Sequence, residues 1–345
     1  MSASGPDPAA RPLGGSYPVS AYLLLGVLAL VVGGSALLLG RGDLGDPELR
    51  PVLLELRATR VGAAFLAGAA LGLAGVLVQG LFRNALASPS ILGTTTGAAL
   101  FGQLALLLHA SLAASGLLGA TPPAMIHPLA CLLGALASLA VLLLFVRRGI
   151  DRIALLLTGF ILSALFGSLG SFVASLAQEE FELGRAIVAF SLGGVGGVGP
   201  QRVLLALPIV TAAAGAAWFW GRPLDLLLAG EEEAGALGVD VGRARRWTVI
   251  WAGLATGAAV SLGGNVTFVG LVVPHALRPI VGASHRRLVP AVVLAGGAFL
   301  VLCDVVARVA PTRSEAPLGV ITGLIGAPVF LVLLLRAHRQ GRLDG

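Results

Sequence analysis

The stretch Gly264-Asn-Val-Thr-Phe-Val-Gly-Leu-Val-Val-Pro-His-Ala-Leu-Arg278 is apolar along most of its length, yet it carries Pro274, His275 and Arg278 near its end. An ionisable group at membrane depth is costly unless it faces a cavity, a partner or the interface. A helix surrounded by lipid has no use for such residues. We therefore take Pro274, His275 and Arg278 as candidates for a gate or transport pathway. A metal-ligand role for His275 is disfavoured because no second ligand stands at a matching spacing, so a structural hydrogen bond is the simpler alternative.

The composition requires a lipid environment. Of 345 residues, 57% are hydrophobic and only 12% are charged, and the mean hydropathy is +0.94. A soluble domain of this length cannot bury so much apolar surface, so we predict an all-α polytopic membrane protein. Segments of about 20 apolar residues span a bilayer. The sequence offers about ten, near 20–40, 60–81, 92–109, 127–146, 153–177, 202–220, 246–263, 266–282, 288–306 and 318–336.

These spans divide the chain into a transmembrane domain, 20–336, and two short tails, 1–19 and 337–345. The first tail is rich in Gly, Pro, Ser and Ala, and we expect it to be disordered. The glycine-rich stretch Gly193–Gly199 predicts a broken or re-entrant piece, which membrane proteins tolerate only inside protein or beside water. Cys131 and Cys303 both lie in apolar runs, so we expect buried thiols rather than a disulfide or a metal site.

The distribution of arginine sets the expected orientation. Cytoplasmic loops of membrane proteins carry an excess of basic residues. An even number of spans puts both termini on one side, and the loops of that side hold Arg83, Arg147, Arg148, Arg152, Arg222, Arg243, Arg245, Arg246, Arg286 and Arg287. The opposite loops are richer in acids, with Asp43, Asp46, Glu48, Glu55, Glu179, Glu180, Glu182 and Glu315. We predict a multi-pass membrane protein with both termini in the cytoplasm.

The chain lacks the motifs of a nucleotide-hydrolysing enzyme. A phosphate-binding P-loop requires lysine, and the sequence contains none. If ATP drives this protein, a separate chain hydrolyses it. The loop containing Gly230, Glu231, Ala234, Leu237 and Gly238 begins with acids and ends on glycine, which predicts a short helix able to dock on such a partner. A solvated loop with one helical turn is the alternative.

Arginines also mark the opposite face. Arg57 and Arg60 lie three residues apart at the mouth of the second predicted span, and Arg308 ends the ninth. Guanidinium groups suit bidentate pairing with carboxylates, so an outer partner bearing Asp or Glu is one interpretation. Interfacial snorkelling is the alternative for each arginine. Asp304 stands four residues before Arg308, a spacing that predicts an ion pair within the helix.

Polar residues at the inner end of the second span are further candidates. Gln79 lies within the span, and Asn84 follows it directly. They either line a route through the protein or tie helices together.

Six segments, in this order, resemble the permease subunits of bacterial ABC importers for iron chelates, haem and cobalamin, the FecCD/BtuC family with the type II import fold. They are Arg57-x-x-Arg60 with Gly68, Gly75 and Gln79; Asn84-Ala-Leu86-Ala87-x-Pro89-x-x-Leu92-Gly93; Gly230-Glu231-x-x-Ala234-x-x-Leu237-Gly238; Gly264 to Arg278; Asp304-x-x-Ala307-Arg308; and Pro317-x-Gly319 with Gly326-Ala327-Pro328-x-Phe330. The resemblance runs from about Arg57 to Arg336. One departure is Ala85, where the family usually has proline.

The resemblance implies ten helices in each subunit, pairing with a second permease, and two cytoplasmic ATPases that use ATP and Mg. It implies that a periplasmic or lipid-anchored binding protein docks on Arg57, Arg60 and Arg308. It also implies that the segment Glu231–Gly238 is the coupling helix and that an inner gate includes Ile150, Asp151, Arg152 and Ile153. No cofactor or metal is expected on this chain, and its non-protein surroundings are membrane lipid, not nucleic acid.

Three questions stay open from sequence. The transported chelate is not specified, nor is the choice between a homodimer and a heterodimer. Two rival functions are an ion-coupled secondary transporter, which needs a midplane acid, and an intramembrane hydrolase built on Ser261 or Ser163 with His275.

Overall fold

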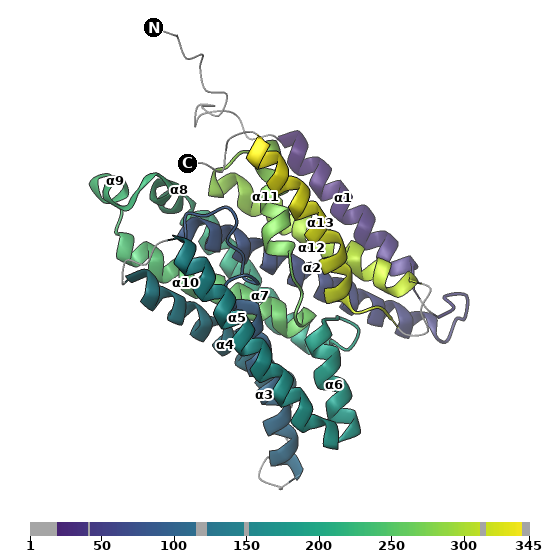
Figure 1. The fold of residues 1–345 in the computed structure, drawn as a ribbon. Helices are drawn as coiled ribbons and strands as arrows, with labels where there is room; N and C mark the ends of the chain where they lie inside the picture. The colour runs from purple at the N-terminus through teal and green to yellow at the C-terminus, as the bar shows by residue number, and fades with distance from the viewer. Residues whose placement is uncertain (1–18, 41, 115–122, 148–151, 311–314, 340–345) are drawn as a thin grey trace.

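A computed structural model describes residues 19–40, 42–114, 123–147, 152–310 and 315–339 (Figure 1). Within these residues the regular structure is entirely helical. The elements in chain order are α1 (Val19–Leu38), α2 (Arg50–Leu81), α3 (Thr94–Ala114), α4 (Pro123–Arg147), α5 (Arg152–Leu176), the 3₁₀ turn η1 (Ala177–Glu179), α6 (Phe181–Leu192), α7 (Pro200–Phe219), α8 (Gly221–Ala229), α9 (Glu231–Ala236), α10 (Val241–Gly263), α11 (Val269–Val281), α12 (His285–Val309) and α13 (Leu318–Arg339).

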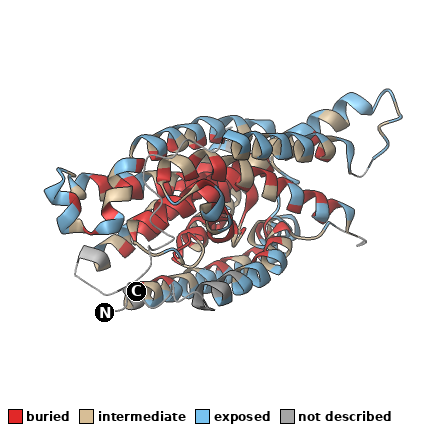
Figure 2. Ribbon diagram, turned by 90° about the horizontal axis from the view of Figure 1, so that it is seen from above, coloured by how far each residue is buried: buried red, intermediate tan, exposed pale blue. Residues whose placement is uncertain are grey.

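Helix α2 forms the centre of the bundle and packs against α12, α10, α11 and α7. Small residues allow this close packing. A Cβ atom added at Gly68 would lie 2.1 Å from the carbonyl oxygen of Gly296 in α12, and one at Gly75 would lie 1.9 Å from that of Gly270 in α11. These two crossings explain why Gly68 and Gly75 belong to the family pattern. Buried residues gather along this core, and exposed ones cover the outer helices (Figure 2).

The outer helices present apolar surface, as a lipid environment requires. On α1 and α5, side chains such as Leu24, Leu30, Phe160 and Phe172 are more than half exposed. Within the described residues, seven helices are long and apolar enough to cross a membrane: α1, α2, α3, α4, α5, α7 and α12. Together with α10, α11 and α13 they account for the ten predicted segments, so the predicted fold class is confirmed.

Several predicted boundaries were wrong. The second span starts at Arg50 rather than near residue 60, because Pro51 opens the helix in its first turn and the outer arginines are part of the helix. The seventh starts at Val241, where the Asp240 side chain accepts a hydrogen bond from the Arg243 backbone amide, 2.9 Å away. Helix α11 covers only 13 residues of the predicted 266–282 segment.

Helix α11 is short because non-helical backbone precedes it. At about 1.5 Å per residue it reaches about 20 Å, less than the hydrocarbon thickness. Phe268, the residue before its first turn, has a φ of 65°, a left-handed conformation that is rare outside glycine. The backbone amide of Asn265 donates to the carbonyl of Phe190, so protein rather than lipid satisfies this segment.

The predicted broken piece at Gly193–Gly199 is a turn between α6 and α7. The amide of Gly194 donates to the Gly263 carbonyl, 2.9 Å away, and the Gly193 carbonyl accepts from the amide of Leu318 at the same distance. The turn thus joins the end of α10 to the start of α13. Helix α6 was not predicted as a separate element because its 12 residues are too few to cross a bilayer, although Gly193 marks its end.

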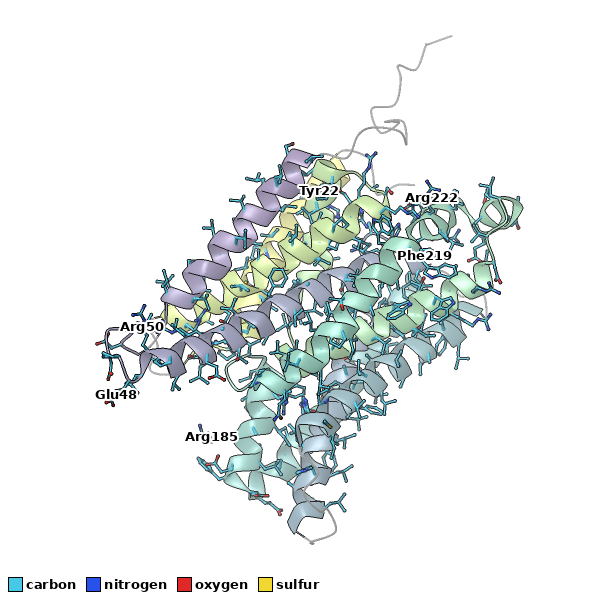
Figure 3. All side chains as sticks on the ribbon, turned by 180° about the vertical axis from the view of Figure 1, so that it is seen from behind. Tyr22, Glu48, Arg50, Arg185, Phe219 and Arg222 are labelled. Carbon is cyan, nitrogen blue, oxygen red and sulfur yellow. The ribbon has the colours of Figure 1, made fainter. Side chains whose placement is uncertain are left out.

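The bundle has two distinct ends. Helices α8 and α9 mark one end, and α6 with the 193–199 turn marks the other (Figure 1). Helix α1 starts at the α8–α9 end, since the Tyr22 hydroxyl donates to the Arg287 carbonyl at the start of α12, 3.0 Å away. Figure 3 labels Tyr22 and Arg222 at this end, away from Glu48 and Arg50. Cys131 and Cys303 are both buried free thiols, as predicted.

Candidate functional site

At the α6 end, Arg60 bridges two carboxylates. Its Nε and Nη2 atoms donate to Asp304, with distances of 2.8 to 3.1 Å, and its Nη1 donates to Glu315 Oε1 at 2.9 Å. Asp304 also lies 3.1 Å from Arg308 Nε, which confirms the predicted ion pair within the helix. The Asp304 side chain is almost fully buried, whereas that of Glu315 is 38% exposed. The cluster therefore reaches the surface through Arg60 and Glu315.

The other two arginines hold the end of α1. The last carbonyl groups of a helix have no partners within it. Arg57 donates to the carbonyls of Leu37 and Leu38 at 3.1 and 3.0 Å, and Arg308 donates to those of Ala36 and Leu39 at 3.1 and 3.0 Å. The positive charges also suit the negative end of the helix dipole. These contacts fasten α1 to the core.

This geometry changes the interpretation of the arginines. Arg57 and Arg308 are only 6% and 5% exposed, so neither presents its side chain on the surface of this structure as an interfacial arginine would. Arg60 is the most accessible of the three, with a side chain 16% exposed. Docking of a partner on Arg57, Arg60 and Arg308 stays a prediction, and the structure adds Glu315 as the exposed acid of this cluster, whereas Asp304 is buried beneath it.

A cavity of about 910 Å³ lies beside this cluster. It is enclosed by α6, the 193–199 turn and the starts of α4 and α7, and its wall includes His127, Gln178, Arg185, Arg202 and Glu315. His127 is buried, and neither ring nitrogen has a hydrogen-bond partner among the described residues. No sequence pattern singled out this histidine, because it stands alone in an apolar run.

At the opposite end, the predicted short helix is present as α9. Its first turn contains Glu231, Glu232 and Glu233, and Gly238 just beyond it has a φ of +84°. Glycine also suits the position before it, since Gly230 has a φ of 159°, which residues with a side chain rarely adopt. The exposed side of this turn ends on Leu237, which is 67% exposed, and Ala234 faces inward with no exposed surface. An acidic turn with a protruding leucine is a suitable shape for docking into another protein.

Helices α8 and α9 are both attached to the transmembrane helices by charged groups. Glu231 in α9 forms an ion pair with Arg245 in α10. Asp225 in α8 accepts hydrogen bonds from the Ser284 hydroxyl and the His285 backbone amide, each at 2.9 Å. Its Oδ1 also lies 2.5 Å from His285 Nδ1. Sequence analysis missed Asp225 and His285, because only the fold brings residues 60 positions apart together.

His285 in turn touches the end of α2. A Cβ atom added at Gly80 would lie 2.5 Å from His285 Nε2, so the imidazole ring packs directly on this glycine. The neighbouring residue, Gln79, is buried and links α2 to α11. Its Nε2 donates to the Gly270 carbonyl at 3.4 Å, and its Oε1 accepts a hydrogen bond from Arg278. A continuous set of contacts therefore runs from α8 to α11.

Helix α11 carries Pro274, His275 and Arg278, the candidate gate residues of the 264–278 segment. Pro274 and Pro279 lie inside the helix, and each removes one backbone donor from it. His275 is partly exposed, and its Nδ1 atom has no hydrogen-bond partner among the described residues. The structure shows no hydrogen bond at this nitrogen, and the structural hydrogen bond expected for His275 stays a prediction. Within the described residues no group of three metal-ligating side chains occurs either.

Asn84 shapes the turn after α2 rather than reaching toward Gln79. Its Oδ1 accepts a hydrogen bond from the Leu86 amide at 2.8 Å, as in an Asx turn. The following loop packs on α5, where the Ser163 hydroxyl donates to the Ser90 carbonyl at 3.2 Å. Of the predicted gate, Ile150 and Asp151 lie outside the described residues, and Arg152 and Ile153 form the first turn of α5.

The serine–histidine alternative finds no support in the geometry. The Ser261 hydroxyl donates to the Ala258 carbonyl at 2.8 Å, and Ser163 is bonded to the loop after α2. Neither serine forms a hydrogen bond with His275 in the described part of the chain. The buried Asp304 is likewise held by two arginines, which leaves it poorly suited to carry a coupling proton.

Comparison with known proteins agrees with this architecture. The model of the FecCD transport family matches residues 19–336. The cobalamin import system permease protein BtuC of Halobacterium salinarum is 39% identical over 292 residues, covering 84% of this chain and 75% of the relative. The Fe(3+) dicitrate permease protein FecD of Escherichia coli is 38% identical over 285 residues, with 83% and 85% covered. The hemin permease protein HmuU of Yersinia pestis is 34% identical, with 84% of each chain covered.

A solved structure shows the same fold. It is an ABC transporter assigned to the metal-chelate type, in an inward-facing conformation, with a TM-score of 0.78 and 31% identity. The match covers 93% of this chain and 99% of that one. Family model, relatives and solved structure confirm the resemblance noted from sequence, and the chain belongs to the FecCD transport family of membrane permeases.

Proposed function

We propose that this chain is the permease subunit of an ABC importer that moves a metal chelate, of the iron-siderophore, haem or cobalamin kind, from the outer face of a bacterial inner membrane to the cytoplasm. The observation that carries the proposal is the set of contacts from α8 through His285 to α2 and α11. It supplies a mechanical route from a docking surface to the centre of the bundle.

In this mechanism two separate ATPase subunits bind at the α8–α9 end, which is the cytoplasmic end. Helix α9 offers them its acidic turn and Leu237. Movement of α8 on ATP binding acts on His285 through Asp225, and His285 packs on the end of α2. The hydrogen bond between Gln79 and Arg278 then carries the movement to α11, where Pro274 and Pro279 each remove a backbone donor. The ATPase site and the bundle core are thus linked by a coupling free energy, not by a chemical reaction in this chain.

The pathway itself forms between two permease subunits. A second copy, or a close paralogue, packs on this chain, and the substrate passes between them. The names of the relatives support the chelate class, since cobalamin, ferric dicitrate and hemin all are bulky metal complexes.

A substrate-binding protein docks at the α6 end, which is the outer face. Of Arg57, Arg60 and Arg308, only Arg60 has a side chain that reaches the surface, where it pairs with Glu315. Acidic residues of the binding protein compete with Glu315 for Arg60. Such rim charges set the rate and register of docking more than its final affinity.

The experiment is a transport assay with defined subunits. The chain is reconstituted in liposomes with its two ATPases and its binding protein, loaded in turn with haem, cobalamin or a ferric siderophore. We expect ATP-dependent accumulation of one chelate and none without ATP. The proposal fails if ATP-driven uptake is absent for every chelate that the binding protein retains.

A charge-reversal variant tests the docking of the binding protein separately from transport. Arg60→Glu is expected to slow association of the binding protein, whereas Arg185→Glu, also an exposed arginine at the α6 end, serves as the control. Surface plasmon resonance on nanodisc-embedded transporter measures both association rates. Equal rates for Arg60→Glu and the unchanged chain would exclude Arg60 from the docking surface.

A further inference from the structure

All four tryptophans of the chain lie at one place. Trp218 and Trp220 end α7, and Trp247 and Trp251 lie in the first half of α10. This is the α8–α9 end of the bundle, where Figure 3 labels the neighbouring Phe219 and Arg222. Tryptophan prefers the boundary between water and hydrocarbon, because one end of its ring system is polar. The cluster therefore marks the level at which α7 and α10 enter the membrane.

Three of the four rings form a ladder. The Trp220 and Trp247 centroids are 6.5 Å apart with an interplanar angle of 25°, and those of Trp247 and Trp251 are 6.4 Å apart at 17°. Trp247 and Trp251 lie about 9 and 15 Å along the axis from the first residue of α10. The ladder thus runs from the interface into the hydrocarbon, parallel to an acyl chain.

A groove follows this ladder. It has a volume of about 450 Å³ and is lined by Ala216, Trp220, Arg243, Trp247 and Trp251. Arg243 is its one charged wall residue, at the outermost position, and its side chain is 62% exposed. Trp247 remains 40% exposed although its ring is one of the largest apolar groups in the protein. An apolar slot with a cation at its mouth matches the two parts of a phospholipid.

The surrounding charges favour an anionic lipid. Arg222 in α8, Arg246 in α10 and Arg286 in α12 lie at the same end, and the Arg286 guanidinium stands 5.0 Å from the centroid of the Trp218 ring. The nearest acid is Asp240, whose carboxylate caps α10 and lies 3.6 Å from Arg243 Nε. Asp225 is occupied by Ser284 and His285. Glu231, Glu232 and Glu233 of α9 also lie at this end, and Glu231 is paired with Arg245. Because Arg243 is among the residues that line the groove and no acid is, a headgroup with net negative charge is attracted there more than a zwitterionic one.

We propose that the groove between α7 and α10 binds one anionic phospholipid. Its phosphate pairs with Arg243, and one acyl chain lies along Trp247 and Trp251. The site is separate from the transport pathway and from the docking surfaces proposed above, and it does not depend on which chelate is carried.

The test uses the tryptophans themselves. The full chain is purified and placed in nanodiscs of unlabelled phosphatidylcholine. A small share of this lipid is replaced by a lipid with dibrominated acyl chains, which is phosphatidylglycerol in one series and phosphatidylcholine in the other. Bromine quenches only nearby rings, and every tryptophan of the chain is in this cluster. We expect half-maximal quenching at about fivefold lower mole fraction of brominated phosphatidylglycerol than of brominated phosphatidylcholine. This is the change in affinity that one arginine contributes at an anionic lipid surface.

Variants locate the effect. Arg243→Gln is expected to remove the preference for phosphatidylglycerol. Arg50 is an exposed arginine at the far end of α2, and Arg50→Gln is expected to preserve the preference. Replacing Trp247 and Trp251 together by Phe is expected to remove most of the lipid-dependent quenching. Matching gel-filtration profiles and thermal midpoints establish that the variants are folded.

The proposal is overturned if the unchanged chain is quenched equally by both lipids, a comparison that needs no variant. It is also overturned if Arg243→Gln keeps the full preference. A third arm adds inorganic phosphate in excess over the lipid. Reversal of quenching by phosphate would assign the site to a free anion instead of a lipid.

Discussion

Replacing Asp225 by alanine removes the polar contacts that join α8 to α12, while the buried Leu224 and Leu227 of α8 stay in place. Its carboxylate receives two hydrogen bonds of 2.9 Å, from Ser284 and the His285 amide, and stands 2.5 Å from His285 Nδ1. A hydrogen bond to a charged group contributes about 1.5–3 kcal/mol. The three are not additive and the side chain is 25% exposed, so we take about 3 kcal/mol for the set. At 1.4 kcal/mol per factor of ten, the equilibrium for docking α8 on the bundle falls about a hundredfold.

The expected consequence is uncoupling. In proteoliposomes with the ATPases and binding protein, chelate accumulated per ATP hydrolysed is expected to fall about tenfold or more, because the free energy that links the two sites is lost. Hydrolysis itself continues, since the α9 surface is intact. Asp240→Ala is the matched control, as Asp240 is an exposed acid of the same connection that caps α10. Asp225→Asn keeps an acceptor for the His285 amide, and its chelate accumulation per ATP is expected to lie between those of Asp225→Ala and Asp240→Ala.

The reasoning is refuted if Asp225→Ala transports with the same yield per ATP as Asp240→Ala and the unchanged chain. Loss of ATPase binding in Asp225→Ala would also contradict it, because that result would place Asp225 in the docking surface instead of behind it.

Three further predictions concern the bundle. Gly75→Ala places a methyl group against a carbonyl of α11 at 1.9 Å and is expected to cost about 3 kcal/mol or more, seen as a lower thermal midpoint in detergent, whereas Gly215→Ala, with nothing within 4 Å, leaves it unchanged. Asp304→Asn breaks a buried ion pair and is expected to lower the free energy of unfolding by about 3–5 kcal/mol. Glu315 is more exposed, and Glu315→Gln is expected to lower it by less than about 1 kcal/mol. Equal shifts of the thermal midpoint in the two variants would contradict this. Gln79→Leu cuts the link to α11 and is expected to lower uptake without lowering ATPase binding; normal uptake would remove Gln79 from the coupling route.

The fold was predictable where one physical signal acts over a long stretch. Long apolar runs predicted the ten segments, and glycines such as Gly68 and Gly75 marked the helix crossings that the structure shows. The boundaries were less predictable, because helix ends depend on local caps and on charged residues that continue the helix past the apolar run. Arg50 to Arg60 illustrate this, since their polarity suggested a loop but they extend α2.

The non-helical parts of the core were harder to predict. The strained Phe268 and the hydrogen bonds among residues 190–194, 263–265 and 317–318 depend on three segments that are distant in sequence. Neither the hydrophobic periodicity nor the composition of a segment indicates which distant segment its backbone will bond to. The glycines of this region did indicate that the backbone there is irregular.

The candidate site divides in the same way. The ion pair of Asp304 with Arg308 followed from helical spacing, and α9 followed from its acidic turn and glycine stop. The capping of α1 by Arg57 did not, because nothing in the sequence tells an arginine that faces a partner from one that binds carbonyls of its own chain. Asp225 and His285 were missed because only the fold brings together residues 60 positions apart.

The placement of Arg57 also changes one expectation. As docking residues at the mouth of a span, Arg57 and Arg60 could both be reversed to glutamate to test partner binding without changing the fold. In the structure a glutamate at position 57 would face the carbonyl oxygens at the end of α1, which repel it. We now expect Arg57→Glu to destabilise the chain, and only Arg60→Glu remains a clean test of docking.

The central claim is that this permease has no drive of its own and depends on ATPases bound at the α8–α9 end. Uptake of the cognate chelate into liposomes that hold the chain and its binding protein, with and without the ATPases, tests it most directly. We expect accumulation against a gradient only when the ATPases and ATP are present, and none from an imposed proton or sodium gradient. Uphill accumulation in liposomes that lack the ATPases would contradict the account.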